Sequence, residues 1–314
     1  MDRALESGND RKVVVSGLGG IDLSAEPDSD AGLDVIPWLK SPKTKKFMGK
    51  QDQLAVIAAG RALRDAGIEE GALLEGAGVY LCVGYIPFEQ QDLEPLVRDS
   101  TAAGRFCMER FSAEGLEQVN PLLTFRCLPN MPIFHISMNF GIQGTYFITY
   151  PGVGQYYQAL ERAVGDLRRG VVDLALVGAV ADQDNFLVRH HLRRFSSSEA
   201  GTEPDWSVVP DSAGCLCLEL EDSVRNRGGN SRLDLVSFGI EYEAPDLLAG
   251  PSTYSEKITL NRRADAAGNR PYHGAASLPL SLCQLAGAGT GEEIVHKVST
   301  FDGFAATSRW RDHA

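Results

Sequence analysis

The stretch GTYFITYPGVGQYYQALERAVGDLRRGVVDLALVGAV (144–180) decides the fold. It begins with a strand-like run, and Gly152 and Gly154 permit a tight turn into the next element. Apolar residues then recur every three or four positions, which predicts an amphipathic helix over 152–169. The following run, 171–180, is short and almost wholly apolar, as expected for a strand buried on both faces of a sheet. We therefore expect a layered α/β protein built on buried strands and covering helices.

The same alternation continues on both sides of this unit. Gln53 to Ala66 repeats the helical pattern and is followed by Gly67. Four further runs read as strands: 12–23, 76–85, 213–220 and 231–243. A Ser-, Gly- and Pro-containing segment, FSSSEAGTEPDWS (195–207), is typical of a junction. We expect it to separate two halves of one compact unit, residues 1–195 and 196–314. The segment 243–271 has little periodicity and reads as a loop.

Composition limits the function classes. The chain has 314 residues, of which 43% are hydrophobic and 23% charged, which is ordinary for a globular protein with a sizeable core. Its formal net charge of −12 argues against nucleic-acid binding, because phosphate neutralisation needs a basic surface. The first residues, MDRALESGNDRK, contain no signal-peptide core, and no apolar run is long enough to span a membrane. We expect a cytoplasmic protein that makes no membrane contact.

Cysteine and histidine usage gives no metal site. The six cysteines are scattered, and Cys215 with Cys217 makes a CxC pair rather than a zinc-type CxxC. They are interpreted as reduced core residues, Cys127 included, and His135 as structural. The neighbours His190 and His191 point to different faces of a helix, and no carboxylate at helical spacing completes a ligand set. We therefore expect no metal and no cofactor.

Five segments in order resemble the β-ketoacyl synthases of the thiolase superfamily, the condensing enzymes of fatty-acid and polyketide synthesis. The segments are KVVVSGLGGIDL (12–23), QLAVIAAGRALRDAGI (53–68), NPLLTFRCLPNMPIFHISMNFGIQG (120–144), the elbow and helix after it, and WSVVPDSAGCLCLELEDSVRNRG (206–228). In the third segment Pro121, Asn130 and Gly144 fall on positions typical of the family. The resemblance implies an α/β fold: a thiolase-like layered α/β/α/β/α sandwich, here with a truncated second half.

The resemblance also implies that the catalytic groups of the family are absent. Family members carry a Cys at the mouth of the helix, where the positive end of the helix dipole stabilises thiolate. This sequence has Val153 there, and a valine side chain cannot hold an acyl chain as a thioester. The His-Gly-Thr-Gly-Thr motif is missing, and in the Gly-His-x-x-Gly-Ala-Ala motif only GAAS (274–277) survives. Pro271 takes the histidine position, with His273 two residues nearer.

Without these catalytic groups, the chain resembles the chain-length factors of bacterial type II polyketide synthases. Those subunits pair with an active ketosynthase and shape the tunnel into which its product grows. The shortened second half is similar to the compact subunits associated with aryl polyene and related polyene clusters. The resemblance implies a heterodimer formed through the strand 144–150 and a partner acyl carrier protein. Bulky or interface candidates for the tunnel are Phe106, Met108, Phe111, Leu123, Phe125, Phe134, Thr149 and Tyr150.

The run KSPKTKKFMGK (40–50) is basic in an acidic protein. Its ordinary interpretation is a solvated loop. A sharper hypothesis is that Lys43, Lys45 and Lys46 attract an acyl carrier protein, since such partners are strongly acidic and complementary charge raises encounter rates.

Two other functions remain open from the sequence. One is a thiolase-fold decarboxylase or hydrolase that works without a Cys nucleophile, using His273 or His296 with backbone N–H groups as an oxyanion site. The other is a homodimeric acyl-binding or scaffolding protein. The product, the chain length and the starter unit are not readable from the residues.

Overall fold

The fold was taken from a computed structural model, which describes residues 11–24, 33–85, 88–193, 209–242, 255–260, 263–264, 271–286, 293–300 and 303–313. Ten strands form one sheet in the order β10-β9-β11-β12-β8-β1-β7-β6-β2-β5. Their bounds are β1 Val13–Asp22, β2 Gly78–Val83, β5 Tyr146–Thr149, β6 Ala175–Ala181, β7 Ser212–Leu220, β8 Leu233–Tyr242, β9 Ser255–Leu260, β10 Arg263–Ala264, β11 Glu293–Ser299 and β12 Phe304–Asp312.

Helices account for most of the remaining described chain. The α-helices are α1 Lys50–Asp65, α2 Ala72–Glu75, α3 Gln90–Asp99, α4 Met108–Arg110, α5 Leu123–Cys127, α6 Met131–Phe140, α7 Val153–Arg169, α8 Phe186–Arg193, α9 Glu221–Asn226 and α10 Ser277–Leu285. The short helices are η1 Ile36–Trp38, η2 Pro42–Phe47, η4 Leu116–Gln118 and η5 Gly274–Ala276, with a π-helical turn η3 at Phe111–Gly115.

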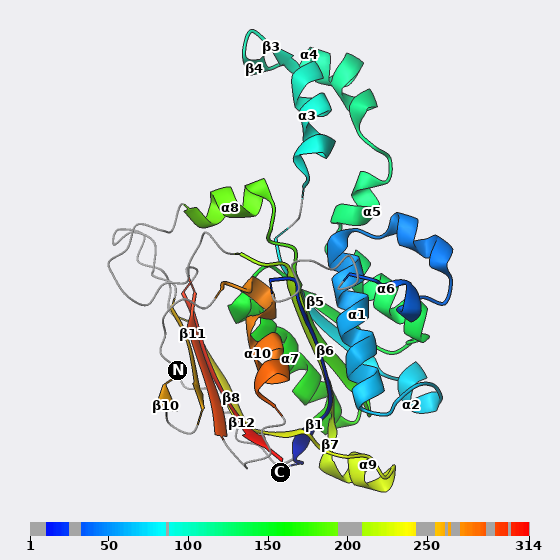
Figure 1. Ribbon diagram of the computed structural model, residues 1–314, viewed down its shortest axis with the longest axis vertical. Helices are drawn as coiled ribbons and strands as arrows, with labels where there is room; N and C mark the ends of the chain where they lie inside the picture. Colours follow the sequence, from blue (N-terminus) through cyan, green and yellow to red (C-terminus); the bar gives the residue numbers. More distant parts are fainter. Residues whose placement is uncertain are drawn as a thin grey trace.

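The sheet bends at the contact between β1 and β8, where only Val14 and Val15 pair with Asp234 and Leu233. One part, β5-β2-β6-β7-β1, carries α1 and α6 on its outer face, and α7 and α10 lie between the two parts (Figure 1). Helix α7 contacts strands of both parts, from β2, β5, β6 and β7 to β11 and β12. The molecule is therefore the layered α/β arrangement expected from the sequence, with α7 at its centre.

Strands β8, β12, β11 and β9 have one face that points away from α7. No helix of the described chain covers that face (Figure 1). The side chains on it are mostly polar. Lys257 of β9 stands directly opposite Lys297 of β11, and the row continues through Thr307 to Gly239. Over the described residues the second half thus contributes a sheet without an outer helical layer.

The glycine-rich first strand has a packing reason. A Cβ on Gly17 would lie 2.2 Å from the carbonyl oxygen of Ala62, and one on Gly19 would lie 2.1 Å from that of Ala58. Both carbonyls belong to α1, so the backbone of the helix rests directly on the backbone of β1. Any side chain at these two positions would force the layers apart.

The predicted elements are found with small shifts of their ends. Helix α7 ends at Gly170, which has the left-handed φ of 70° expected of a glycine that closes a helix. The predicted strand 171–180 begins later, at Ala175, because Val171 is 56% exposed and belongs to a turn. The interpretation of 243–271 as a loop was wrong for Ser255–Leu260, which forms β9 on the edge of β11. The predicted junction, 195–207, lies outside the described residues.

An arm made of residues 88–122 extends from the body (Figure 1). It contains α3, the two-stranded ribbon β3 (Thr101–Ala102) with β4 (Arg105–Phe106), and the turns of helix that follow. Its large apolar side chains are solvent-exposed, as with Phe106 and Met108 at 64% each. A monomer rarely exposes such a group without a partner.

No helix in the described part of the chain is both long and apolar enough to cross a membrane.

Candidate functional site

The elbow at Val153 is built from the edge of the sheet inward. Strand β5 ends at Thr149, a cis peptide joins Tyr150 to Pro151, and Gly152 caps α7. Val153 is the first residue of the helix and is 1% exposed, packed in the main core. The position at the positive end of a seventeen-residue helix therefore carries a buried isopropyl group and no nucleophile.

A cysteine does lie beneath the elbow, on the neighbouring strand. The Cys82 thiol, on β2, donates to the carbonyl oxygen of Gly152 at 3.3 Å. Burial raises the pKa of Cys82 to about 12. Its sulfur is consequently a protonated thiol at neutral pH and no substitute for a catalytic thiolate.

The loop just before η5, which we call the motif loop of the second half, places His273 beside Ser212 and Asp22. The His273 Nδ1 lies 3.3 Å from Ser212 Oγ, and its Nε2 lies 3.7 Å from Asp22 Oδ2. These are the residue types of a hydrolytic triad. Ser212, however, is 0% exposed on β7, and the contact to Asp22 is longer than a hydrogen bond. The hydroxyl has no surface from which to attack a bound ester or thioester.

His296, the other histidine of the enzymatic alternative, is also enclosed. It is 0% exposed on β11, with Nδ1 2.7 Å from the Tyr157 hydroxyl and Nε2 2.6 Å from Glu256 Oε1. Both ring nitrogens are used inside the protein. Among the described residues, no group of three His, Cys, Asp or Glu side chains is placed to hold a metal ion.

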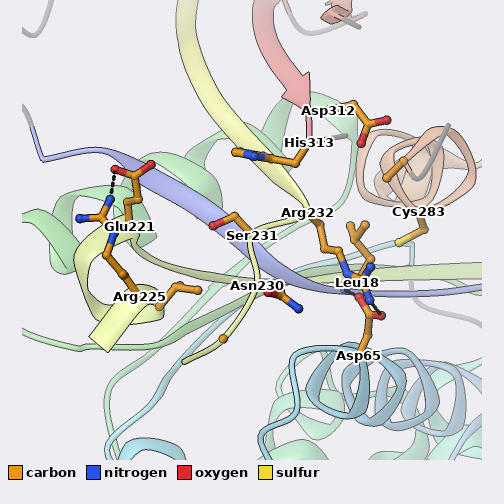
Figure 2. A pocket seen from close by; sticks show the side chains of 13 residues that line it. Leu18, Asp65, Glu221, Arg225, Asn230, Ser231, Arg232, Cys283, Asp312 and His313 are labelled. Atoms are coloured by element: carbon orange, nitrogen blue, oxygen red, sulfur yellow. Dashed lines mark hydrogen bonds and ion pairs between the residues drawn. The ribbon is translucent and has the colours of Figure 1, made fainter. Parts of the chain in front are cut away.

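A cavity of about 840 Å³ lies at the opposite end of the strands from the elbow (Figure 2). Charged side chains from several elements line it, and two of them, Asp65 and Arg232, form an ion pair at 2.6 Å. Glu221 and Arg225 of α9 pair at another wall. Strand β7 runs antiparallel to β6 and ends beside this cavity. The cavity therefore opens away from Val153. It is not part of the elbow site.

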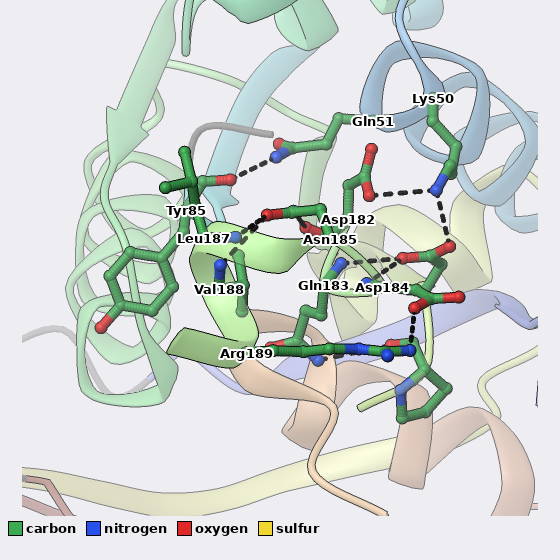
Figure 3. A network of polar contacts seen from close by, with 12 residues as sticks. Lys50, Gln51, Tyr85, Asp182, Gln183, Asp184, Asn185, Leu187, Val188 and Arg189 are labelled. Atoms are coloured by element: carbon green, nitrogen blue, oxygen red, sulfur yellow. Dashed lines mark hydrogen bonds and ion pairs between the residues drawn. The ribbon is translucent and has the colours of Figure 1, made fainter. Parts of the chain in front are cut away.

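A network of polar side chains orders the loops beside the elbow (Figure 3). Lys50 Nζ lies 3.2 Å from Asp182 Oδ1 and 2.9 Å from Asp211 Oδ2. Burial and the charge of Asp211 together raise the pKa of Asp182 to about 7, against the opposing charge of Lys50. Asp211 also accepts the backbone N–H of Gln183 at 2.8 Å. The loop after β6 and the loop before β7 are therefore tied to the start of α1.

The same network holds the motif loop of the second half. Gln183 donates through Nε2 to the carbonyl oxygen of Tyr272 at 2.7 Å. A Cβ on Gly274 would lie 2.2 Å from Gln183 Oε1, and Gly274 has a φ of +52°. Glycine is thus required there by both space and conformation. The sequence gives no signal for this role of Gln183, because the role depends on a contact with Tyr272, 89 positions away.

Three aromatic rings gather at the carboxyl ends of β2 and β5, where α/β sheets commonly bind ligands. Tyr85 follows β2. The centroid of its ring lies 4.5 Å from the ring centroid of His191 and 6.2 Å from that of Tyr150. Tyr150 immediately precedes the elbow proline and is 42% exposed. On the same helix His190 is exposed, whereas the half-buried ring of His191 packs against that of Tyr85 at an interplanar angle of 52°.

The predicted tunnel and interface residues fall on four segments. Phe106, Met108 and Phe111 lie on the arm, where the rings of Phe106 and Phe111 are 5.7 Å apart. Phe125 and Phe134, on α5 and α6, are 47% and 49% exposed. The buried members are Leu123 and Thr149, each 8% exposed. Within one chain the arm residues do not reach the elbow, where Tyr150 lies.

The three lysines of the basic run lie on η2 and are exposed. Lys46 places its Nζ 4.7 Å from the centre of the Phe47 ring, a cation–π contact. Lys50, from the same run, is instead committed to the buried network.

Comparison with known proteins identifies the family. The model of the β-ketoacyl synthase N-terminal domain matches residues 22–204, more than half of the chain. The chain belongs to the β-ketoacyl synthase family. A curated relative, the mitochondrial 3-oxoacyl-[acyl-carrier-protein] synthase of Arabidopsis thaliana, is 22% identical over 250 residues. That match covers 74% of this chain, which spans about half (50%) of the relative's length.

Solved structures agree on the fold. A chain from a type II polyketide synthase acyl-carrier protein in complex with its ketosynthase, bound to the hexaketide, has a TM-score of 0.66 at 14% identity, over 96% of this chain and 99% of that one. A β-ketoacyl synthase from Burkholderia phymatum has a TM-score of 0.66 at 16% identity, over 97% and 100%. The ishigamide ketosynthase/chain length factor has a TM-score of 0.61 at 17% identity, over 97% and 100%.

Proposed function

We propose that this chain is a non-catalytic companion of an active ketosynthase, similar to a chain-length factor of type II polyketide or polyene biosynthesis. The observation that carries the proposal is Val153, which is buried at the first position of α7. Neither Cys82, nor the enclosed His296, nor the buried Ser212 beside His273 supplies a substitute nucleophile. A family member that keeps the elbow but cannot bind an acyl chain covalently there is best suited to line the tunnel in which a partner's product grows.

Strand β5 supports a paired assembly. It is the last strand of the sheet, and the Val79 N–H donates to the carbonyl of Thr145 at 2.9 Å. In a parallel ladder the backbone groups alternate in direction, so those of Tyr146 and Ile148 point away from β2. The outer edge is short and apolar and lacks the charges that usually protect an edge. A strand of a partner subunit could form hydrogen bonds with the outward-pointing backbone groups of Tyr146 and Ile148.

The arm supports the same role. Its exposed side chains, Phe106 and Met108 above all, lie on a projection with little core of its own. Burying such side chains against a second subunit is worth roughly 25 cal/mol per Å² of apolar surface. Phe125, Phe134 and Tyr150 are further exposed aromatic side chains outside the arm. We assign the arm to the subunit interface and the aromatic side chains nearest the elbow to the acyl tunnel.

The deciding experiment is co-expression with an intact ketosynthase encoded beside this chain, followed by size exclusion and a malonyl-condensation assay. Each protein is assayed alone and together, with malonyl-loaded acyl carrier protein. We expect a one-to-one complex whose condensation is lost when the partner's catalytic Cys is changed to Ala. The His273→Ala variant of this chain should leave that rate unchanged.

Two results would overturn the proposal. Condensation or malonyl decarboxylation by this chain alone, lost in His273→Ala, would make it an enzyme. A stable homodimer that binds acyl chains and ignores the ketosynthase would make it a scaffold. Changing Tyr150 or Phe134 to Ala in the complex then tests the tunnel. A smaller side chain should leave a deeper tunnel, and the product should become longer.

A further inference from the structure

A run of buried hydrogen bonds links β12, β11 and β9 to the central helix α7. The Trp310 Nε1–H, on β12, donates to Ser308 Oγ at 2.9 Å. Ser308 Oγ lies 2.9 Å from the Tyr157 hydroxyl, which in turn lies 2.7 Å from His296 Nδ1. These four side chains are all 0% exposed. A polar chain this deep in a core is costly unless every member is satisfied.

The run ends on one carboxylate. His296 Nε2 lies 2.6 Å from Glu256 Oε1, and the Ser277 hydroxyl donates to the same oxygen. Glu256 belongs to β9, its side chain is 14% exposed, and Ser277 begins α10. The contacts therefore connect three strands of one part of the sheet, β9, β11 and β12, with the two helices that lie between the parts, α7 and α10.

Proton counting gives the run one direction. If His296 is neutral with its proton on Nε2, it donates to Glu256, accepts from Tyr157, and leaves Tyr157 to accept from Ser308, which accepts from Trp310. Every proton then has an acceptor. If His296 were doubly protonated, Tyr157 would have to donate to Ser308, and no described group accepts the Ser308 proton. An unpaired buried hydroxyl costs about 1–3 kcal/mol.

The position of Tyr157 connects the run to the elbow. Tyr157 lies four residues after Val153, one turn along the same face of α7. At its other end the run reaches β9, which is the edge of the sheet apart from the two residues of β10.

We propose that Glu256 and His296 are positioning residues, which act through Tyr157 to hold the first turns of α7 and strand β9 in one register, with His296 fixed as the neutral Nε2–H tautomer. The proposal does not depend on the function assigned to the elbow. It concerns how a chain without the family's catalytic histidines keeps its two halves together.

The tautomer is tested on the unaltered protein. Long-range ¹H–¹⁵N correlation on the ¹⁵N-histidine-labelled full chain at pH 7 reports the two imidazole nitrogens of His296 separately, with assignment by the His296→Phe variant. We expect a protonated Nε2 and an unprotonated Nδ1. A doubly protonated ring, or a proton on Nδ1, would overturn the proposal whatever the variants do.

Hydrogen exchange tests the positioning. In Glu256→Ala and His296→Phe we expect the amides of residues 255–260 and of Tyr157 to exchange at least ten times faster than in the parent. Glu256→Gln, which keeps the acceptor oxygen, should restore most of the protection. Lys257→Ala is the matched control, because Lys257 is next in the strand but faces the opposite side.

The outcomes separate cleanly. Unchanged exchange over 255–260 in Glu256→Ala would overturn the proposal, as would equal loosening by Lys257→Ala. A mixed result, with β9 released but Tyr157 as protected as before, would overturn the connection to α7.

Discussion

Phe304 rests against Gly154, the second residue of α7. A Cβ on Gly154 would lie 3.0 Å from the Cβ of Phe304 and 3.2 Å from its Cγ. Phe304 begins β12 and is held by pairing with Tyr242 of β8. The start of β12 thus places an aromatic ring at the elbow.

This contact predicts an effect of Gly154→Val that depends on Phe304. The new side chain cannot displace a strand residue, so we expect a loss of about 1–3 kcal/mol in the free energy of unfolding. In Phe304→Ala the same change should cost less, because the Cγ and the ring are gone and only the Cβ contact remains. Denaturant unfolding of the two single variants and the double variant measures the coupling. Strictly additive effects would refute the steric reading.

Asp52 predicts a dependence of stability on pH. Burial raises its pKa to about 8, against a hydrogen bond from the backbone N–H of Gly49. A carboxyl whose pKa is raised by folding stabilises the native state below its unfolded pKa of 3.8, and that stability is lost as pH rises through about 8. Asp52→Asn stays neutral and keeps an acceptor for Gly49. We expect the parent to lose stability relative to Asp52→Asn from about pH 4 to pH 8, by at most about 1.4 kcal/mol per pH unit.

The measurement is the unfolding free energy of both proteins at pH 5, 6, 7 and 8. Asp182, whose pKa burial also raises, is present in both chains and cancels in the difference. Parallel curves would show that Asp52 is already ionised in the folded protein. His135, 3.9 Å away, does not offset the effect, because burial lowers the pKa of its ring.

The spacing of apolar residues and the glycine that ends the helix made the central unit predictable. The helical spacing of 153–167 and the closing Gly170 identify α7, and the apolar runs identify β1, β2, β6, β7 and β8. Val153 and Pro271 could be placed because the motifs around them survive. Strand β9 was missed because Ser255–Leu260 alternates only weakly and is defined by pairing with β11, far along the chain.

Side-chain partners could not be predicted in the same way. Glu256, Gln183 and Tyr85 carry no local signal, since each acts through a residue on another element. His296 and His273 stood out by residue type alone, and only their surroundings separate a buried structural ring from a catalytic one. The arm was invisible because its residues pack on little else within the chain.

The lysine hypothesis is best tested by a pair of equal charge changes. Lys43→Glu with Lys45→Glu alters the exposed helix η2, whereas Lys257→Glu with Lys297→Glu alters the outer face of the second sheet. If carrier protein docks at η2, the first pair should weaken its binding at least tenfold at low salt, and the second should change it less than twofold. The difference should shrink at high salt, where exposed charges are screened. Equal effects of both pairs would reduce the interaction to net charge.

Ile148→Pro should separate folding from assembly. The N–H of Ile148 points away from β2, so proline there removes a donor toward a partner strand while leaving the ladder with β2 intact. We expect the isolated chain to unfold at nearly the same denaturant concentration as the parent, while its affinity for the ketosynthase falls about tenfold or more, as loss of a buried interface hydrogen bond implies. Ile148→Val keeps the N–H and should bind as the parent does. Phe147→Pro, whose N–H points toward β2, should instead destabilise the isolated chain. Retained affinity in Ile148→Pro would mean that the partner does not extend the sheet through β5, and the arm alone would then have to hold the complex.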